Sequence, residues 1–173
     1  MLKSELKLER PTESNVIKGL HHNAYRCRDT EETRKFYEDF LGLPLVHSFV
    51  IEQTKSGRES NVLHSFFQMG DGSSLAFFEE PGEPFEFKEQ RDFDLHIALE
   101  VDYEHMMAMK KRGEDAGIET RGVSDHGFIK SIYFRDPNGY VIELTSPVSG
   151  EEGDVFDKEK AHQVLNEWQS NKS

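Results

Sequence analysis

An internal repeat constrains this chain more than any other feature of its sequence. One unit begins with the run Gly19–Asp29 and a second with Asp94–Asp102, and each run carries a His two residues before an Ala and closes on an Asp. A helical pattern and three strand-like stretches follow each run, so that each unit is predicted to fold as βαβββ. The predicted fold class is therefore α+β, with paired βαβββ modules forming a curved mixed sheet around a cavity.

The residues at the helix ends support this prediction. Asp29 can cap the first helix, with Glu32 three residues on, and Gly42 suits the left-handed residue that ends it. The second helix is predicted from about Tyr103 to near Gly117, although Gly113 in its interior is a poor helix former. The strands that follow are predicted at 44–51, 61–69 and 74–80 in the first unit, and at 118–122, 130–134 and 140–146 in the second.

The repeat also predicts the domain boundaries. Residues 16–148 are expected to form a single domain, with modules at 16–80 and 93–148, preceded by an N-terminal extension at 1–15. Residues 149–173 form a C-terminal tail. Apolar residues at helical spacing in this tail predict an amphipathic helix that packs on the domain or on a second subunit.

Charge and cysteine content exclude several classes of protein. The 173 residues include 33 acidic against 21 Lys and Arg side chains, a formal net charge of −12, and no basic cluster is dense enough to offset it. This argues against nucleic-acid and anionic-membrane partners. A single cysteine, Cys27, cannot form an internal disulfide, and no segment has the length of a signal or membrane span. We expect a soluble cytoplasmic protein.

Three side chains at related places in the repeat predict a metal site. His22 and His96 occupy the same place on the first strand of each unit, and Glu143 on the last strand has Ala76 as its repeat partner. A pseudo-twofold pairing of the units would bring His22, His96 and Glu143 around one cavity, while Ala76 leaves the fourth corner without a ligand. Two imidazoles and one carboxylate with open positions form the facial arrangement of non-haem Fe(II) oxygenases.

Three segments together resemble one known superfamily. They are His22–Asp29, Phe36–Leu43 and the Asp-Pro-Asn-Gly turn that leads into Glu143. The chain resembles the vicinal oxygen chelate proteins, which include glyoxalase I, bleomycin-resistance proteins, fosfomycin-resistance thiol transferases and extradiol dioxygenases. The resemblance covers roughly residues 16–148. It implies a metal-dependent enzyme with a small-molecule substrate, and a homodimer, because dimers are common in the superfamily.

Within that superfamily, the segment His126–Glu143 resembles the extradiol dioxygenase signature. The resemblance implies that His126 and Tyr133 are catalytic, with His126 hydrogen-bonding the metal-bound catecholate and Tyr133 holding its ionised oxygen. It also implies Fe(II), with O2 as cosubstrate. One departure is Ser73, which stands where two-domain extradiol enzymes carry a further catalytic His. The predicted substrate pocket comprises Phe66, Ser73 and Phe78.

Our leading hypothesis is an extradiol-type dioxygenase acting on a catechol-like or other vicinally oxygenated substrate, with three alternatives. A glyoxalase-type lyase needs a fourth metal ligand. Ala76, at the position of that ligand, has no donor atom in its side chain, which argues against this class. A fosfomycin-type transferase uses the same three ligands with Mn(II), but its anionic substrate has few cationic candidates beyond Arg26, Lys130 and Arg135. A non-enzymatic resistance protein that binds small molecules generally lacks the triad. Fe(II) is the preferred metal, and Mn(II), Ni(II) and Zn(II) also accept these ligands.

Overall fold

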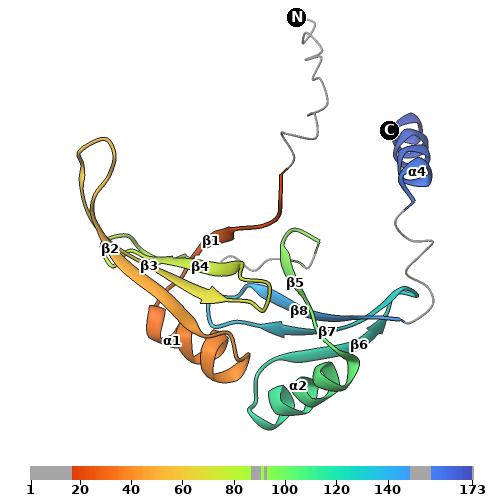
Figure 1. Ribbon diagram of the computed structural model, residues 1–173, viewed down its shortest axis with the longest axis horizontal. Coiled ribbons are helices and arrows are strands. Elements are labelled where there is room, and N and C mark those ends of the chain that lie inside the picture. The colour runs from red at the N-terminus through yellow and green to blue at the C-terminus, as the bar shows by residue number, and fades with distance from the viewer. Residues whose placement is uncertain (1–16, 87–90, 92, 149–156, 173) are drawn as a thin grey trace, which may run out of the picture.

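The computed structural model describes residues 17–86, 91, 93–148 and 157–172, and it contains the two predicted modules (Figure 1). The first module consists of β1 (His22–Arg26), α1 (Thr30–Arg34), η2 (Lys35–Phe40), β2 (Leu45–Gln53), β3 (Glu59–Gln68) and β4 (Ser74–Glu79). The second consists of β5 (His96–Glu100), α2 (Tyr103–Asp115), β6 (Thr120–Asp125), β7 (Ile129–Arg135) and β8 (Val141–Pro147), and α4 (Lys158–Asn171) follows. Each module is βαβββ, as predicted.

Each module forms its own mixed four-stranded sheet. The strand orders are β1-β4-β3-β2 and β5-β8-β7-β6, and in each sheet the first strand of the module pairs parallel with the last. Both sheets carry their helices on the same side, so the opposite faces of the two sheets open in one direction (Figure 1). The predicted α+β fold of paired βαβββ modules is confirmed, and each module contributes its own four-stranded mixed sheet.

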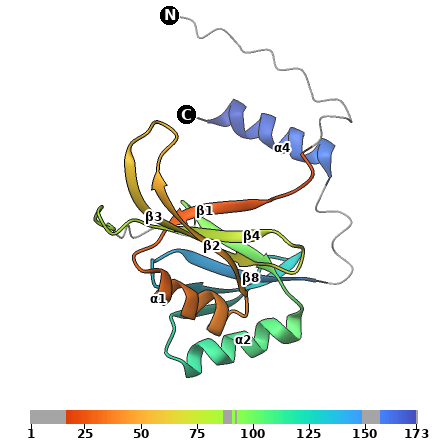
Figure 2. The ribbon, with the colours of Figure 1, turned by 60° about the vertical axis from the view of Figure 1, so that its left-hand side comes forward.

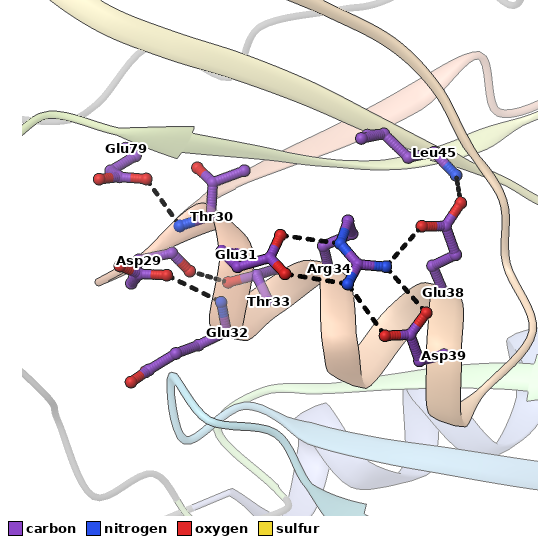
Figure 3. Close-up of polar contacts among 10 residues, drawn as sticks. All are labelled: Asp29, Thr30, Glu31, Glu32, Thr33, Arg34, Glu38, Asp39, Leu45 and Glu79. Atoms are coloured by element: carbon purple, nitrogen blue, oxygen red, sulfur yellow. Dashed lines mark hydrogen bonds and ion pairs between the residues drawn. The ribbon is translucent and has the colours of Figure 1, made fainter.

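The first helix begins where the capping residue predicts. Asp29 accepts a hydrogen bond from the backbone N–H of Glu32 at 2.8 Å, and Gly42 takes a positive φ of 85° after the helix ends. Between these points the helix widens into the π-helical segment η2. Arg34 bonds Glu31, Glu38 and Asp39, as Figure 3 shows. Glu38 also accepts a hydrogen bond from the backbone N–H of Leu45 at 3.0 Å, which ties this end of the helix to the start of β2.

Gly113 lies inside α2 because no larger residue fits there. A Cβ atom at this position would lie 2.5 Å from both the Phe134 ring and the Thr120 hydroxyl. The unfavourable helix propensity of glycine is thus accepted in exchange for close contact between α2 and the second sheet. The helix ends at Asp115, and Gly117 follows with a positive φ of 68°.

The helix-facing sides of the two sheets share one apolar core. In the first module, the buried Tyr37 ring lies 4.7 Å from the Phe77 ring. In the second, Met106 of α2 belongs to the same cluster, and an edge-to-face contact of Phe40 with Phe134 at 5.2 Å joins the modules. Burial of these rings stabilises the helix side and leaves the opposite face of each sheet free for other uses.

A buried polar seam fixes the modules side by side. Tyr37 donates from its hydroxyl to Asp136 at 3.0 Å, and the Asn138 side chain donates to the Thr33 hydroxyl at 3.1 Å. Asn138 also accepts from the backbone N–H of Arg28 at 2.8 Å. Burial raises the pKa of Asp136, while its hydrogen-bond donors act in the opposite direction. The turn at residues 136–139 therefore joins the second module to the helix of the first.

The predicted C-terminal helix is confirmed as α4, but its packing is not seen in one chain. None of its residues is buried, and Val164, Leu165 and Trp168 are more than half exposed. The helix stands apart from both sheets in Figure 2. Among the described residues, no helix is long and apolar enough to cross a bilayer.

Candidate metal and substrate site

The open face of the second module holds a cavity of about 700 Å³. The strand period of two places alternate side chains on this face, opposite to α2. His96, Arg121, Tyr133 and Glu143, which we call the second-module face, all line the cavity. The remaining lining residues are Arg91, Phe93, Ser124, His126, Phe128 and Ile129. Two predicted metal ligands and both predicted catalytic residues thus share one cavity.

His96 and Glu143 are placed as a pair of metal ligands would be. The parallel pairing of β5 with β8 sets Ala98 beside Glu143 and brings His96, two residues earlier, onto the same face. His96 Nε2 lies 3.3 Å from Glu143 Oε2, and the Glu143 side chain is 6% exposed against 42% for His96. A buried carboxylate beside an accessible imidazole fits the donor set of a divalent ion.

The two predicted catalytic residues form a chain with Glu143. The Tyr133 hydroxyl donates to Glu143 Oε1 at 3.4 Å, and His126 Nε2 lies 3.0 Å from the same hydroxyl oxygen. The Tyr133 hydroxyl therefore lies between the His126 ring and the Glu143 carboxylate. The structure therefore connects His126 to the predicted metal ligand through Tyr133.

His22 lies on the other module and away from this pair. Its ring contacts Phe66 at 5.3 Å and His64 at 6.0 Å on the open face of the first sheet. No group of three or more His, Cys, Asp or Glu side chains in the described part of the chain is arranged to hold a metal ion. His22, His96 and Glu143 are therefore not brought together within the described part of a single chain.

The predicted correspondence between the modules is confirmed by strand register. Ala24 pairs with Ala76 in the first sheet as Ala98 pairs with Glu143 in the second. The register extends across both sheets, where Phe66 corresponds to Tyr133 and His47 to Arg121. We call His22, His47, Phe66 and Ala76 the first-module face. It carries no carboxylate at the position of Glu143.

The predicted pocket residues divide between two places. Phe66 and Phe78 lie on the open side of the first sheet, where the His64 ring contacts both, at 4.2 and 3.8 Å. Ser73 instead donates from its hydroxyl to Asp71 at 2.6 Å and lines a separate cavity of about 560 Å³ between the modules. Ser73 is therefore not brought together with the other two.

None of the three cations considered from sequence lines the 700 Å³ cavity. Arg26 bonds Glu80 at 2.9 Å, and Arg135 bonds the Gly139 carbonyl at 2.9 Å. Lys130 lies 5.7 Å from the ring of Tyr103, the first residue of α2.

Two other arginines do line it, and sequence reasoning missed both. The Arg121 guanidinium lies over the Tyr133 ring at 5.4 Å, and Arg91 bonds Asp94 at 3.0 Å. Arg121 belongs to no sequence motif, and the pairing of β6 with β7 sets it directly across from Tyr133.

Comparison with known proteins agrees with this fold. The family model described as Glyoxalase/Bleomycin resistance protein/Dioxygenase superfamily matches residues 19–144. A metallothiol transferase FosB of Bacillus licheniformis is 28% identical over 153 residues, 87% of this chain and 86% of that protein. A lactoylglutathione lyase of Neisseria meningitidis serogroup A is 28% identical over 144 residues, 79% of this chain and 96% of that protein. Among solved structures, the fosfomycin resistance protein FosX of Listeria monocytogenes, in complex with Mn(II) and sulfate, matches with a TM-score of 0.58 and 21% identity, over 78% of this chain and 96% of that one.

Proposed function

Because the chain belongs to the glyoxalase/bleomycin resistance protein/dioxygenase superfamily, we propose that it is a metal-dependent transferase that joins a thiol to a small anionic, oxygenated substrate. One observation carries this proposal: the cavity that holds His96 and Glu143 also contains the Arg121 guanidinium. The FosB relatives, whose name is metallothiol transferase, support the same reaction class. This alternative replaces the extradiol dioxygenase as our leading hypothesis.

We propose that a second copy of the chain completes the metal site. His22 is exposed on a face that opens in the same direction as the second-module face, so neither face can cover the other within one chain. A twofold pairing of the first-module face of one copy with the second-module face of the other brings His22 to His96 and Glu143, and forms two equivalent sites. In this proposal the dimer expected from sequence is required to complete the metal site.

The chain's own residues have separate roles at this site. His22, His96 and Glu143 would hold the ion, and Ala76 leaves the opposite position free for substrate oxygen. A bound divalent ion would act as a Lewis acid toward that oxygen. Arg121 binds the anionic end of the substrate, since guanidinium groups pair well with phosphonate and carboxylate oxygens. Tyr133, held by His126 and Glu143, directs its hydroxyl at the same space.

The direct test uses fosfomycin as a small anionic oxirane and cysteine as the thiol, with Mn(II)-loaded protein and ³¹P NMR detection. In the expected step, the thiolate sulfur bonds an oxirane carbon, the C–O bond breaks, and the oxygen takes up a proton. A new phosphonate signal that requires thiol, metal and protein confirms the proposal. Unchanged fosfomycin with a panel of thiols, alongside turnover of a hemithioacetal, overturns it in favour of a lyase.

The dioxygenase remains a second candidate because of the hydrogen-bonded chain from His126 through Tyr133 to Glu143. Fe(II)-loaded protein, prepared without oxygen, can be given catechols in an oxygen electrode. Oxygen uptake with ring-opened product would favour this candidate over the transferase. The absence of uptake from iron-loaded protein excludes it and leaves the metal site untouched.

The two-copy site has its own test in mixed dimers. His22→Ala and Glu143→Gln should each abolish metal retention alone. When the two variants are mixed in equal amounts and refolded, half of the dimers contain one copy of each variant. Such a dimer carries both substitutions at one site and none at the other, so about one quarter of all sites should bind metal as in the wild type. Recovery of no sites would show that the triad is not shared between copies.

A further inference from the structure

The open side of the first sheet carries a continuous set of rings, which we call the ring surface: Phe49, His64, Phe66 and Phe78. The His64 ring is stacked on Phe78 with centroids 3.8 Å apart and an interplanar angle of 16°. Phe49 lies 5.4 Å from His64 and is stacked with Phe66 at 6.2 Å. These contacts cross three strands, so the ring surface spans most of the sheet.

The ring surface is continuous with the predicted metal ligand of its module. The His22 ring lies 5.3 Å from Phe66, edge to face. His64 is held in place from behind, since its Nδ1 lies 3.0 Å from the Phe77 carbonyl oxygen and its side chain is buried. Phe49 is 42% exposed, which leaves ring faces open toward solvent beside His22.

The second module shows that the fold does not require these rings. By strand register, the counterparts of Phe49, His64 and Phe78 are Ser124, Ser131 and Thr145. Where His64 stacks on Phe78, Ser131 donates to the Thr145 hydroxyl at 3.3 Å. The same scaffold position is thus filled by three rings in one module and by three hydroxyls in the other.

We propose that the substrate carries a flat aromatic or conjugated group, which binds on the ring surface while its anionic end binds Arg121. Exposed ring faces bind flat groups by offset stacking and edge-to-face contact, so a ring on the substrate adds affinity to that of its anionic end alone. This inference rests on the proposed function, because the ring surface and Arg121 border the same substrate only when two copies pair. It names the substrate class as a ring-bearing anion.

The test compares two probes, phenylphosphonate and methylphosphonate, by calorimetric titration of the Mn(II)-loaded dimer. We expect phenylphosphonate to bind at least about fivefold more tightly. Phe49→Ser should remove this preference and leave methylphosphonate affinity unchanged. The matched control is Val50→Ser. Val50 is 52% exposed and lies next to Phe49 on the opposite face of the same strand, so this variant should keep the preference for phenylphosphonate.

Three outcomes overturn the inference. They are equal affinity of wild-type protein for the two probes, equal weakening of both probes by Phe49→Ser, and an unchanged preference in Phe49→Ser together with dissociation of the dimer. The last would show that a second copy covers the ring surface instead of a substrate. Binding is measured without turnover, so a lost ring preference and a failure to transfer thiol to fosfomycin are separate results.

Discussion

The two open faces share one strand register and carry different chemistry. The second-module face presents an arginine, a tyrosine and a carboxylate, whereas the corresponding places on the first-module face hold His47, Phe66 and Ala76. On the helix side, both modules pack apolar side chains into one core. The difference teaches that the fold constrains only the helix side of each sheet. The open sides differ in their side chains: one presents His96, Glu143 and Arg121 to a cavity, and the other carries stacked rings.

Substitution of Glu143 should have the largest effect on the difference between the two faces. Glu143→Gln removes the carboxylate that Glu143 has and its counterpart Ala76 lacks. We expect the metal dissociation constant to rise by at least about 100-fold, which exceeds the effect typical of a residue that only supports a ligand. Competition with a fluorescent chelator measures it. Glu104→Gln, on an exposed part of α2, is the control and should change nothing. Undiminished metal retention in Glu143→Gln would remove the metal from the second module altogether.

Arg121 and His47 test whether the anion binds to one face only. Arg121→Met removes a charged donor from the cavity, and methylphosphonate affinity should fall about tenfold, since hydrogen bonds to charged groups contribute about 1.5–3 kcal/mol. His47→Met, at the corresponding place on the first sheet, should change that affinity less than about threefold. Calorimetric titration of both variants decides the point. Equal losses would mean that the faces share anion binding.

The seam can be weakened without touching either face. Tyr37→Phe removes the hydroxyl that donates to Asp136. Asp136 still accepts hydrogen bonds from the backbone N–H groups of Asn138 and Tyr140. We expect the free energy of unfolding to fall by about 1 kcal/mol, measured by urea denaturation. Tyr103→Phe, at a 47% exposed ring, is the control. A loss no larger than that of the control would show that Asp136 does not hold the modules together.

The smallest effect concerns the helices. Arg34 lowers the pKa values of Glu31, Glu38 and Asp39, so its contribution is fully present above the ordinary pKa values of these groups and is lost as pH falls through the lowered values. Arg34→Met should therefore lower the thermal midpoint slightly at pH 7 and less at pH 3. Lys111→Met, which breaks a single exposed pair with Asp115 in α2, should shift it less. A shift from Arg34→Met that is equal at both pH values would contradict this account.

Local patterns in the sequence predicted most of the fold. The cap at Asp29 and the glycine at 42 act over a few residues, the repeat singled out His96 and Glu143, and the resemblance to the extradiol signature singled out Tyr133. The position of His22 could not be obtained this way, because the placement of one module against the other depends on contacts between distant residues such as Tyr37 and Asp136. The reaction was harder still, since Arg121 belongs to no motif and was overlooked.

The turn at residues 136–139 shows why recognisable segments and reactive ones need not coincide. The carboxylate of Asp136 and the amide of Asn138 form hydrogen bonds to the first module. The Tyr140 hydroxyl also bonds the first module, since it donates to the Arg26 carbonyl at 2.9 Å. Only Glu143, further along the strand, faces the cavity. The turn therefore supports the architecture of the paired modules, whereas the chemistry of the cavity depends on the side chains of the open faces.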